Sequence, residues 1–518
     1  MKLLNLPKQI KNMQLGTVIA NAENPNTHEF AFVFDKGTKV KKGQYVQAES
    51  EDGLVFGYIA DVYRGNRYFE RAESVSEYER ESKIAEQFPV KDWEYIIGQV
   101  KILGSAEIDE NKLRQKRTSI PPFPGAKVHS ANEDFIKQFV GFVDSGLLLG
   151  KLQNHEVEAK LDMTRLLQKH MAILAMSGAG KSHLASVIIE EILDRKKEDG
   201  RIAIVVVDIH GEYYGFKEDP AYRSKTRVVS GKDIKLSFRR LSPAIVREFF
   251  PDMSHVQYST LSNILKEMRT EIKNEHKEYS IRDLIAKVEE SKSITENVKL
   301  PILRSLRELN SYRIISGTEN PKFAKDIKPG ELLILDLSDL DDYKKKQILV
   351  SYTAKRLFKL RKDGRIPPLI FLVEEAHNFA PERIDKYSGI AKRDIEKIAR
   401  EGRKFGVALC LISQRPVNLS TTALSQCNTH IILRVTNPND LQHIGESSEG
   451  IDQRMLRNIT TLQTGEGIIV GSAVNAPIFI DIRERKSKKK EKGKPLHEQA
   501  IEFENYQQRK EEDVEAFL

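Results

Sequence analysis

The sequence predicts an α/β fold with a core built on a mostly parallel sheet, an inserted helical subdomain and a small N-terminal β-barrel. Three observations support this prediction. From about residue 166, short apolar segments alternate with helical ones, as expected for strands buried on both faces of a sheet. Between about 241 and 316 the chain is charged and mostly helical, which interrupts the α/β pattern. The first 125 residues contain closely spaced strand-like runs, which favour a small antiparallel barrel.

Residues 1–125 are interpreted as this barrel with one flanking helix. The strand-like runs are rich in β-branched and aromatic residues, and turn sequences separate them. A charged segment at 73–87 is predicted to be the flanking helix. The proline-rich run at 120–125 cannot be regular structure, because proline lacks the N–H that a ladder needs, and we interpret residues 126–165 as a linker. The predicted barrel strands are residues 15–20, 29–34, 44–49, 54–63 and 95–103.

Residues 166–482 are interpreted as the core domain, which contains the helical insertion. The composition changes after residue 482. Residues 483–494 carry eight basic and two acidic side chains, so this run holds +6 of the net charge of +8. Such a run either binds phosphate backbones, by releasing counterions from nucleic acid, or is a solvated linker. Residues 496–518 are predicted to form an amphipathic helix that docks on a neighbour. The predicted core strands are residues 170–175, 202–207, 332–337, 369–373, 407–412 and 429–435.

Composition limits the class of protein. The content of 40% hydrophobic and 31% charged residues is that of a globular protein. We find no run of about 18 apolar residues, so no membrane-spanning helix is predicted. The N-terminus lacks the apolar stretch of a signal peptide. Cys410 and Cys427 are the only cysteines, which excludes a disulfide framework and favours a reducing cytoplasm.

A phosphate-binding loop is predicted at residues 175–182, which read Ala-Met-Ser-Gly-Ala-Gly-Lys-Ser. The pattern G-x-x-x-x-G-K-[ST] is met except at Ala175, which requires a negative φ there. The loop follows a predicted strand and precedes a predicted helix, where backbone N–H groups form an anion cradle. A glycine-rich turn of no function is the alternative. The residues predicted to bind nucleotide are Ser177, Gly178, Ala179, Gly180, Lys181, Ser182, His183 and Asp208.

Within this loop we expect Lys181 to reach the β- and γ-phosphates and Ser182 to offer its hydroxyl to Mg²⁺. Hydrolysis of ATP also needs carboxylates. The predicted strand at 369–373 ends in Glu374 and Glu375. We expect Glu374 to join Ser182 in the Mg²⁺ shell and Glu375 to orient or deprotonate the attacking water. The alternative is a strand end with two solvated acids.

Two other predicted strand ends carry polar groups. Asp208 could hold a water or the magnesium cluster, and Gln414 could sense the γ-phosphate; turn-forming roles are the alternative for both. The segment 398–406 contains Arg403 and Arg400, in that order of preference for a side chain that stabilises the transferring phosphoryl group from a neighbouring subunit. The alternative is a solvated helix end whose cations favour the helix dipole.

Together these motifs resemble the HerA family of hexameric DNA translocases, within the FtsK–HerA branch of P-loop ATPases. The likeness spans about residues 16–482 and includes the barrel and its Ile-Pro-Pro-Phe-Pro-Gly run. The matched motifs are Met-Ala-Ile-Leu-Ala-Met-Ser-Gly-Ala-Gly-Lys-Ser, Val-Val-Val-Asp-Ile-His-Gly-Glu-Tyr-Tyr, Val-Glu-Glu-Ala-His-Asn-Phe, Ile-Ala-Arg-Glu-Gly-Arg-Lys-Phe-Gly and Ile-Ser-Gln-Arg-Pro.

The resemblance implies a RecA-like core, a ring of six subunits with ATP and Mg²⁺ at the interfaces, and double-stranded DNA threaded through the pore. It implies that Lys181 is the phosphate-loop lysine, Glu375 the catalytic glutamate and Arg403 the arginine finger acting in trans. Lys169 falls where the family can carry an arginine, and the change to lysine weakens any finger role there. The barrel is expected to dock an effector, either a NurA-like nuclease or a sirtuin-like NADase.

The predicted function is therefore that of an ATP hydrolase of the helicase class, a cytoplasmic hexameric translocase on double-stranded DNA. It would act with its effector in DNA-end processing, as in DNA repair, or in antiviral defence. An alternative is a ring that serves as a scaffold to assemble and regulate the effector. A protein-export ATPase of the conjugation type is a third interpretation, against which the barrel and the proline-rich run argue.

Overall fold

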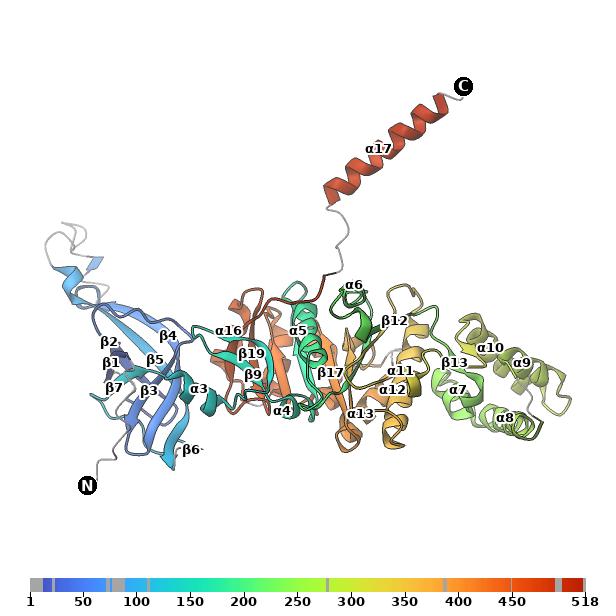
Figure 1. Cartoon of the computed structure of the whole chain (residues 1–518), viewed down its shortest axis with the longest axis horizontal. Helices are drawn as coiled ribbons and strands as arrows, with labels where there is room; N and C mark the ends of the chain where they lie inside the picture. Colours follow the sequence, from blue (N-terminus) through green and yellow to red (C-terminus); the bar gives the residue numbers. More distant parts are fainter. Residues whose placement is uncertain are drawn as a thin grey trace.

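The computed structural model is elongated, with the N-terminal barrel at one end, the α/β core in the middle and the helical insertion at the other end (Figure 1). The flanking helix predicted at 73–87 lies outside the described residues, apart from positions 75 and 76. The structure describes residues 13–20, 24–70, 75–76, 89–109, 112–275, 279–384, 389–448, 450–489 and 496–515.

The N-terminal domain is a closed six-stranded barrel with a seventh strand attached. Its strands follow the order β2-β1-β7-β3-β4-β5-β6, and pairing of β2 with β5 closes the ring. Large side chains such as Phe30, Phe32 and Tyr45 are buried, because strand residues alternate between the inside and the outside of the barrel. All five predicted strands are present. The bounds are β1 Gln14–Ile19, β2 Glu29–Phe34, β3 Tyr45–Ser50, β4 Gly53–Asn66, β5 Glu94–Asp109, β6 Lys112–Lys116 and β7 Lys127–Ser130.

The core is an 11-stranded mixed sheet in the order β12-β15-β11-β16-β17-β10-β18-β19-β20-β8-β9. The strands from β12 to β18 are parallel, and they include all six predicted core strands. The remaining four extend the sheet in antiparallel pairs. The bounds are β8 Leu147–Leu152, β9 Glu158–Leu161, β10 Met171–Leu174, β11 Ala203–Asp208, β12 Thr226–Ser230, β15 Leu332–Asp336, β16 Leu369–Val373, β17 Val407–Ser413, β18 Thr429–Ile432, β19 Glu466–Gly471 and β20 Ile478–Ile482.

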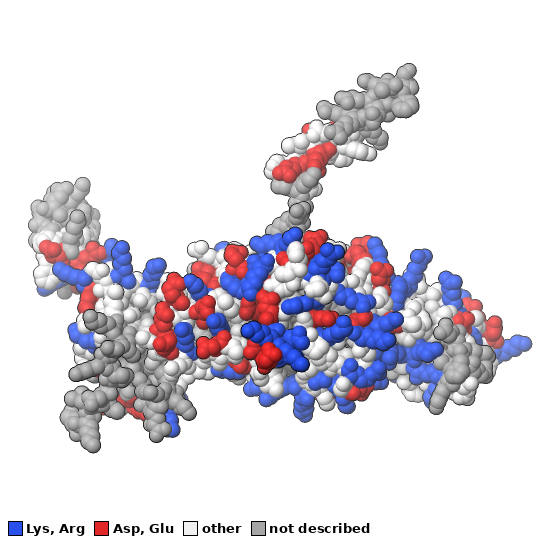
Figure 2. Space-filling view, in the orientation of Figure 1, with Lys and Arg blue, Asp and Glu red and all other residues white. Residues whose placement is uncertain are grey.

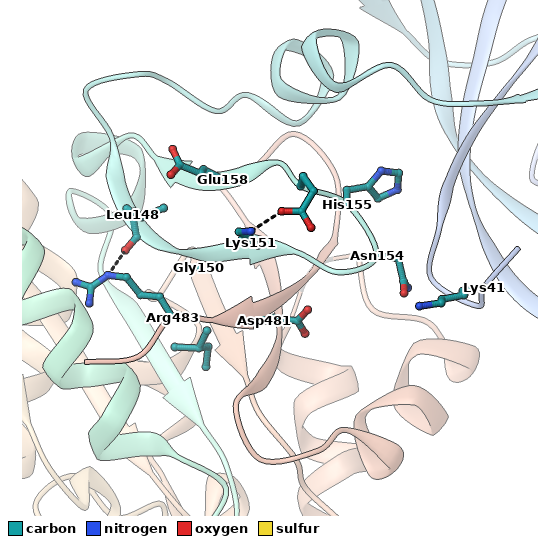
Figure 3. A pocket seen from close by; sticks show the side chains of 11 residues that line it. Lys41, Leu148, Gly150, Lys151, Asn154, His155, Glu158, Asp481 and Arg483 are labelled. Atoms are coloured by element: carbon teal, nitrogen blue, oxygen red, sulfur yellow. Dashed lines mark hydrogen bonds and ion pairs between the residues drawn. The ribbon is translucent and has the colours of Figure 1, made fainter. Parts of the chain in front are cut away.

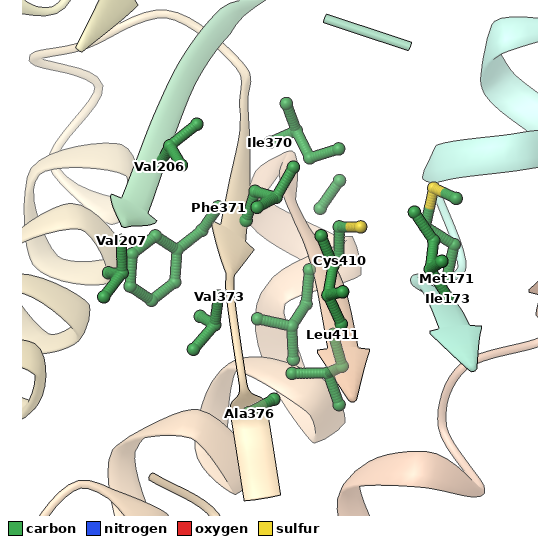
Figure 4. Packing of buried hydrophobic residues seen from close by; sticks show 14 of the residues in the cluster. Met171, Ile173, Val206, Val207, Ile370, Phe371, Val373, Ala376, Cys410 and Leu411 are labelled. Atoms are coloured by element: carbon green, nitrogen blue, oxygen red, sulfur yellow. The ribbon is translucent and has the colours of Figure 1, made fainter. Parts of the chain in front are cut away.

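Apolar side chains from the central strands form the main hydrophobic core. Met171, Val206, Phe371 and Leu411, from four different strands, are fully or almost fully buried in it (Figure 4). Helices cover the sheet and bury their apolar faces against it. Their bounds are α3 Glu133–Val140, α4 Met163–Leu167, α5 Lys181–Leu193, α6 Gly215–Glu218, α11 Phe323–Asp326, α12 Tyr343–Lys362, α13 Lys392–Phe405, α14 Thr421–Leu424, α15 Pro438–Ser447 and α16 Gln453–Thr461.

The helices predicted between residues 241 and 316 form the insertion. A short parallel pair of strands joins its two ends, with Leu236 opposite Ile315. The chain therefore leaves and re-enters the core at one point, which lets the insertion project beyond the sheet (Figure 1). The bounds are α7 Pro243–Phe249, α8 His255–Glu275, α9 Ile281–Glu290 and α10 Glu296–Ser311, flanked by β13 Leu236–Ser237 and β14 Ile315–Ser316.

The prediction that residues 126–165 form a linker is wrong. This segment supplies β7 to the barrel, then α3, and then β8 and β9 to the core sheet. The prolines at 120–125 do exclude regular structure at these positions, but they do not prevent strands and a helix from forming in residues 126–165. The core sheet therefore begins at Leu147 rather than near residue 166, because β20 of the C-terminal part pairs with β8.

The first part of the basic run is neither a free phosphate-binding tail nor a solvated linker. Residues 483–489, called the strap below, pack against α5. Arg483 donates to Glu190 at 2.8 Å and to Glu191 at 2.7 Å, and Ser487 donates to Glu190 through both its backbone N–H and its hydroxyl. The acids of α5 thus neutralise part of the basic charge. Residues 490–494 lie outside the described part of the chain.

The C-terminal helix α17, Leu496–Glu515, extends away from the core (Figure 1). Its side chains Leu496, Phe503 and Tyr506 are exposed. That it docks on a neighbour stays a prediction. Over the described residues, the structure contains no helix with the length and apolar character that crossing a bilayer requires.

Candidate active site

The phosphate loop lies between β10 and α5, as the sequence predicts. Gly178 and Gly180 have φ values of 79° and 106°, a left-handed conformation that glycine adopts without strain. Ala175 is not among the described residues with positive φ, so its replacement of the glycine in the pattern fits the backbone. Its N–H donates to the carbonyl of Ser413 at 3.2 Å, and the N–H of Met176 donates to Arg434 at 2.9 Å. The start of the loop is therefore held by the last residue of β17 and by the segment that follows β18.

Lys181 begins α5 and lies almost buried across the loop. Its ammonium group donates to the carbonyl of Met176 at 3.4 Å. Ser182 follows it in the first turn. The ring of His183 donates a hydrogen bond to the carbonyl of Arg483 in the strap at 2.9 Å, so this ring N–H is already paired within the protein. The backbone N–H groups of this first turn have no partners within the helix, which leaves them for an anion.

Asp208 and Glu374 form a buried carboxylate pair at the carboxyl ends of β11 and β16, and β17 lies between β16 and the strand β10 that leads into the loop. The two acids follow Val207 and Val373, which are opposite each other on β11 and β16. Asp208 is fully buried and accepts four backbone hydrogen bonds, three on Oδ1 from residues 210 to 212 and one on Oδ2 from Tyr213, at 2.7–3.2 Å. Burial raises the pKa of both carboxyl groups. The charge of Asp208 raises the pKa of Glu374 further, whereas the hydrogen bond with Glu374 lowers the pKa of Asp208.

This pair fits a divalent cation that arrives with a nucleotide. Burial disfavours ionisation of both carboxyl groups, and a nearby positive charge offsets that cost. The described residues contain no group of three or more His, Cys, Asp or Glu side chains that could hold a metal ion alone. Mg²⁺ generally takes few protein ligands and completes its shell with phosphate oxygens and water.

Glu375 has an unusual backbone, with φ 45° and ψ 48°. Side chains alternate along a strand, so consecutive Glu374 and Glu375 would otherwise point to opposite faces. The left-handed turn removes this conflict, at a cost in strain that functional sites often carry. Burial raises the pKa of Glu375, while the Lys181 charge and the backbone N–H of Gln414 act in the opposite direction. The turn thus brings Glu375 to the same edge as Lys181.

One oxygen of Glu375, Oε2, is buried and makes no hydrogen bond within the described part of the chain. It lies 3.4 Å from Nδ1 of His377, which shares a 3.0 Å hydrogen bond with Ser413. Burial lowers the pKa of His377 to about 4, so the ring is neutral at pH 7 and does not pair with the carboxylate. Glu375 therefore keeps a free oxygen that can accept a proton from water.

Gln414 and Asp208 lie at the carboxyl ends of parallel strands, since Asp208 is the last residue of β11 and Gln414 directly follows β17. Their roles stay predictions. Sequence reasoning did not identify His377 or Ser413 as members of the site. Their positions in the sequence could have indicated that they belong to the site. His377 comes shortly after the two glutamates, and Ser413 is the last residue of the strand next to β10.

Arg403 and Arg400 lie at the opposite edge of the sheet. Both are on α13, which ends just before β17 begins, and β17 then runs for seven residues, about 20 Å, to reach the phosphate loop. Arg403 is exposed, and Arg400 lies 3.7 Å from Glu396. Lys169 is at the same edge, directly before His170 and β10. The structure therefore separates these cations from Lys181 within one chain.

A cavity of about 630 Å³ lies elsewhere, between the barrel and the antiparallel end of the sheet (Figure 3). Lys41, His155, Asp481 and Arg483 are among the residues that line it. None of the phosphate-loop residues borders this cavity, so it is separate from the nucleotide site.

Comparison with known proteins gives matches along most of the chain. Residues 147–357 match the family described as "Helicase HerA, central domain", and residues 16–107 match the HAS barrel domain. A probable helicase of Methanocaldococcus jannaschii is 31% identical over 88% of this chain and 88% of its own length. A DNA double-strand break repair helicase HerA of Pyrococcus furiosus is 30% identical over 88% and 89%.

Solved structures share the fold at lower identity. VirB4 of Thermoanaerobacter pseudethanolicus aligns with a TM-score of 0.54 and 16% identity, covering 66% of this chain and 98% of its own. The bacterial conjugative coupling protein TrwB aligns with a TM-score of 0.50 and 13% identity, covering 70% and 94%. These two likenesses agree with a P-loop ATPase core.

Proposed function

The chain belongs to the HerA helicase family and is an ATP-hydrolysing enzyme of the helicase class, and we propose that it moves double-stranded DNA through a ring of six copies. The observation that carries this proposal is the separation of Lys181 and Arg403 across the sheet. A phosphate loop with its carboxylates at one edge, and an exposed arginine at the other, suit a site completed by the next protomer.

In this site the N–H groups at the start of α5 and Lys181 hold the triphosphate, and Ser182 with Glu374 and Asp208 would hold Mg²⁺. The metal ion, when bound, neutralises charge on the β- and γ-phosphate oxygens. The free oxygen of Glu375 orients the attacking water and takes its proton. Arg403 of the adjacent copy stabilises the charge that develops on the γ-phosphoryl group. Hydrolysis then depends on assembly, which couples neighbouring protomers.

Duplex DNA is proposed as the substrate because curated relatives, such as that of Pyrococcus furiosus, carry the name of DNA double-strand break repair helicases. On the face shown in Figure 2, Lys and Arg side chains are mixed with Asp and Glu over the core and the insertion, and they do not gather in one basic patch. Arg483 and Lys486 of the strap are paired with acids of α5. We therefore place the DNA contacts on surfaces that ring assembly brings together.

We place the effector on the barrel. The ribbon formed by β4 and β5 projects from the barrel (Figure 1). Exposed Tyr63 lies on β4, while exposed Phe69 lies just after β4 and exposed Trp93 directly before β5, with Arg67 over the Trp93 ring at 5.5 Å. Exposed aromatic residues and arginine are typical of protein interfaces. This observation also favours the second candidate function, in which the ring assembles and regulates a nuclease or an NADase.

Particle mass and ATPase rate test these proposals together. The mass of the full chain is measured with ATP and with linear duplex DNA, and the ATPase rate is measured with and without that DNA. A six-copy particle with strongly stimulated hydrolysis supports the motor. A ring whose turnover ignores DNA, but which binds an added candidate nuclease or NADase tightly, favours the scaffold. Full-rate hydrolysis by a monomer contradicts both.

A further inference from the structure

His170 lies directly before β10 and has a backbone conformation that is unusual for a histidine. Its φ is 60°, a left-handed conformation that residues with a side chain rarely adopt. The residue is only 2% exposed, although it lies where the chain turns into the sheet. Residues keep such a conformation when the surrounding structure requires it. The contacts of the imidazole ring indicate what requires it here.

One side of the ring completes the edge of the sheet. Nδ1 of His170 accepts a hydrogen bond from the backbone N–H of Leu409 at 2.9 Å. Leu409 is the third residue of β17, and the ladder between β10 and β17 begins one residue later, at Met171 and Cys410. The imidazole ring thus adds one hydrogen bond to the ladder between β10 and β17, at a position where the two backbones no longer pair. Since Nδ1 accepts, Nε2 carries the proton of the neutral ring.

The other side of the ring faces the end of α13. A Cβ atom added to Gly402 would lie 3.3 Å from Cε1 of His170 and 2.6 Å from the carbonyl of Val407, so glycine permits the close approach. Burial lowers the pKa of His170 to about 4; the backbone of Ala399 opposes this shift and the Arg403 charge adds to it. The ring therefore lies between the strands of the site and the helical turn that carries Arg403, and it is neutral there at pH 7.

We propose that His170 is a positioning residue for Arg403, which fixes the last turn of α13 against β10 and β17 so that the arginine reaches the neighbouring protomer's nucleotide in the correct geometry. The inference rests on the proposed function, because it requires Arg403 to act in trans. In the structure, the left-handed residue holds its ring between the strands and the helix.

The variant His170→Asn separates positioning from folding. Asparagine tolerates the left-handed backbone and its Oδ1 can accept from Leu409, but it lacks the ring edge that faces α13. We expect KM for ATP to be unchanged and kcat to fall about 10- to 100-fold, since a misplaced group costs about this much. The matched control is His430→Asn, because His430 is an equally buried histidine on the adjacent strand β18 that hydrogen-bonds Ser448. Its kcat should not change.

Mixed rings assign the effect to one side of the interface. A Lys181→Ala chain still offers Arg403 but binds no nucleotide, and an Arg403→Ala chain does the reverse, so mixing the two restores complete sites. His170→Asn is then added to either chain. We expect the recovered activity to fall only when His170→Asn is in the Lys181→Ala chain, which donates the arginine.

Four other results have distinct meanings. Equal loss from either chain, or loss only from the nucleotide-binding chain, overturns the positioning role while the trans site stands. If His430→Asn lowers kcat as strongly as His170→Asn, the effect is general to buried histidines and the inference is wrong. If the parent mixture recovers no activity, the trans site itself is wrong, and the inference falls with it.

Discussion

Asp208 and Glu374 occupy equivalent positions at the ends of two neighbouring parallel strands, and their buried carboxyl groups are hydrogen-bonded to each other. Ile209 donates a further backbone hydrogen bond to Glu374 at 3.2 Å. The chain folds two acids into one low-dielectric position without a balancing cation among the described residues. In the proposed function, this arrangement lowers the stability of the free protein and favours binding of Mg²⁺.

Glu374→Gln should therefore stabilise the protein without nucleotide. The raised pKa values mean that the folded protein keeps a proton here that the unfolded chain releases above about pH 4. The pair's contribution is fully present below that pH and is lost as pH rises towards the raised pKa. We expect a gain of about 1 kcal/mol in unfolding free energy at pH 8 in chelator, and a smaller gain at pH 5. Exposed Glu198→Gln is the control, and an equal or larger gain at pH 5 would contradict the explanation.

Glu375→Gln should bind ATP and fail to hydrolyse it. The amide keeps the shape but cannot take a proton from water, so single-turnover hydrolysis should slow by about 10²- to 10⁴-fold. In the wild-type protein the rate should rise with pH through the raised pKa of Glu375, because only the carboxylate acts as a base. Hydrolysis by the variant at the wild-type rate, measured by quench-flow with radiolabelled ATP, would remove Glu375 from this role.

Arg403→Ala should keep nucleotide affinity and lose turnover, since an arginine finger contributes about 10³- to 10⁵-fold in rate. Arg403→Lys should not restore it, because an ammonium group lacks the planar fork of guanidinium. Lys404→Ala removes a neighbouring exposed cation and serves as the control. Steady-state ATPase assays and fluorescent-nucleotide titrations measure both quantities. The trans assignment fails if Arg403→Ala hydrolyses ATP as fast as the wild type.

Arg483→Ala should destabilise the fold, because it leaves Glu190 buried without its guanidinium partner. The Glu190 side chain is fully buried and that of Arg483 is 14% exposed, and loss of one partner of a buried pair costs about 3–5 kcal/mol. Lys486→Ala is the control, since its side chain is half exposed and such a pair contributes at most about 1 kcal/mol. Urea unfolding compares the two variants. Equal midpoints would show that the strap does not stabilise α5.

Local patterns in the sequence were sufficient for much of this molecule. The apolar runs predicted six of the seven parallel strands of the core, all except β12, and the strand-like runs of the first 125 residues predicted five barrel strands. The phosphate loop and the acids at 374 and 375 were identified because their chemistry depends on spacing over a few residues. The assigned roles of these residues stay predictions, as do the domain boundaries, apart from the linker that the structure corrects.

Other features depend on contacts between distant parts of the chain, and only the tertiary structure decided them. Residues 147–161 join the core because β20, more than 300 residues later, pairs with β8. The strap is held by acids of α5, which its own composition could not indicate. The backbone of Glu375 and the position of His170 follow from packing at the two edges of the sheet. A sequence pattern reports the preference of a segment, whereas these arrangements are set by its partners in space.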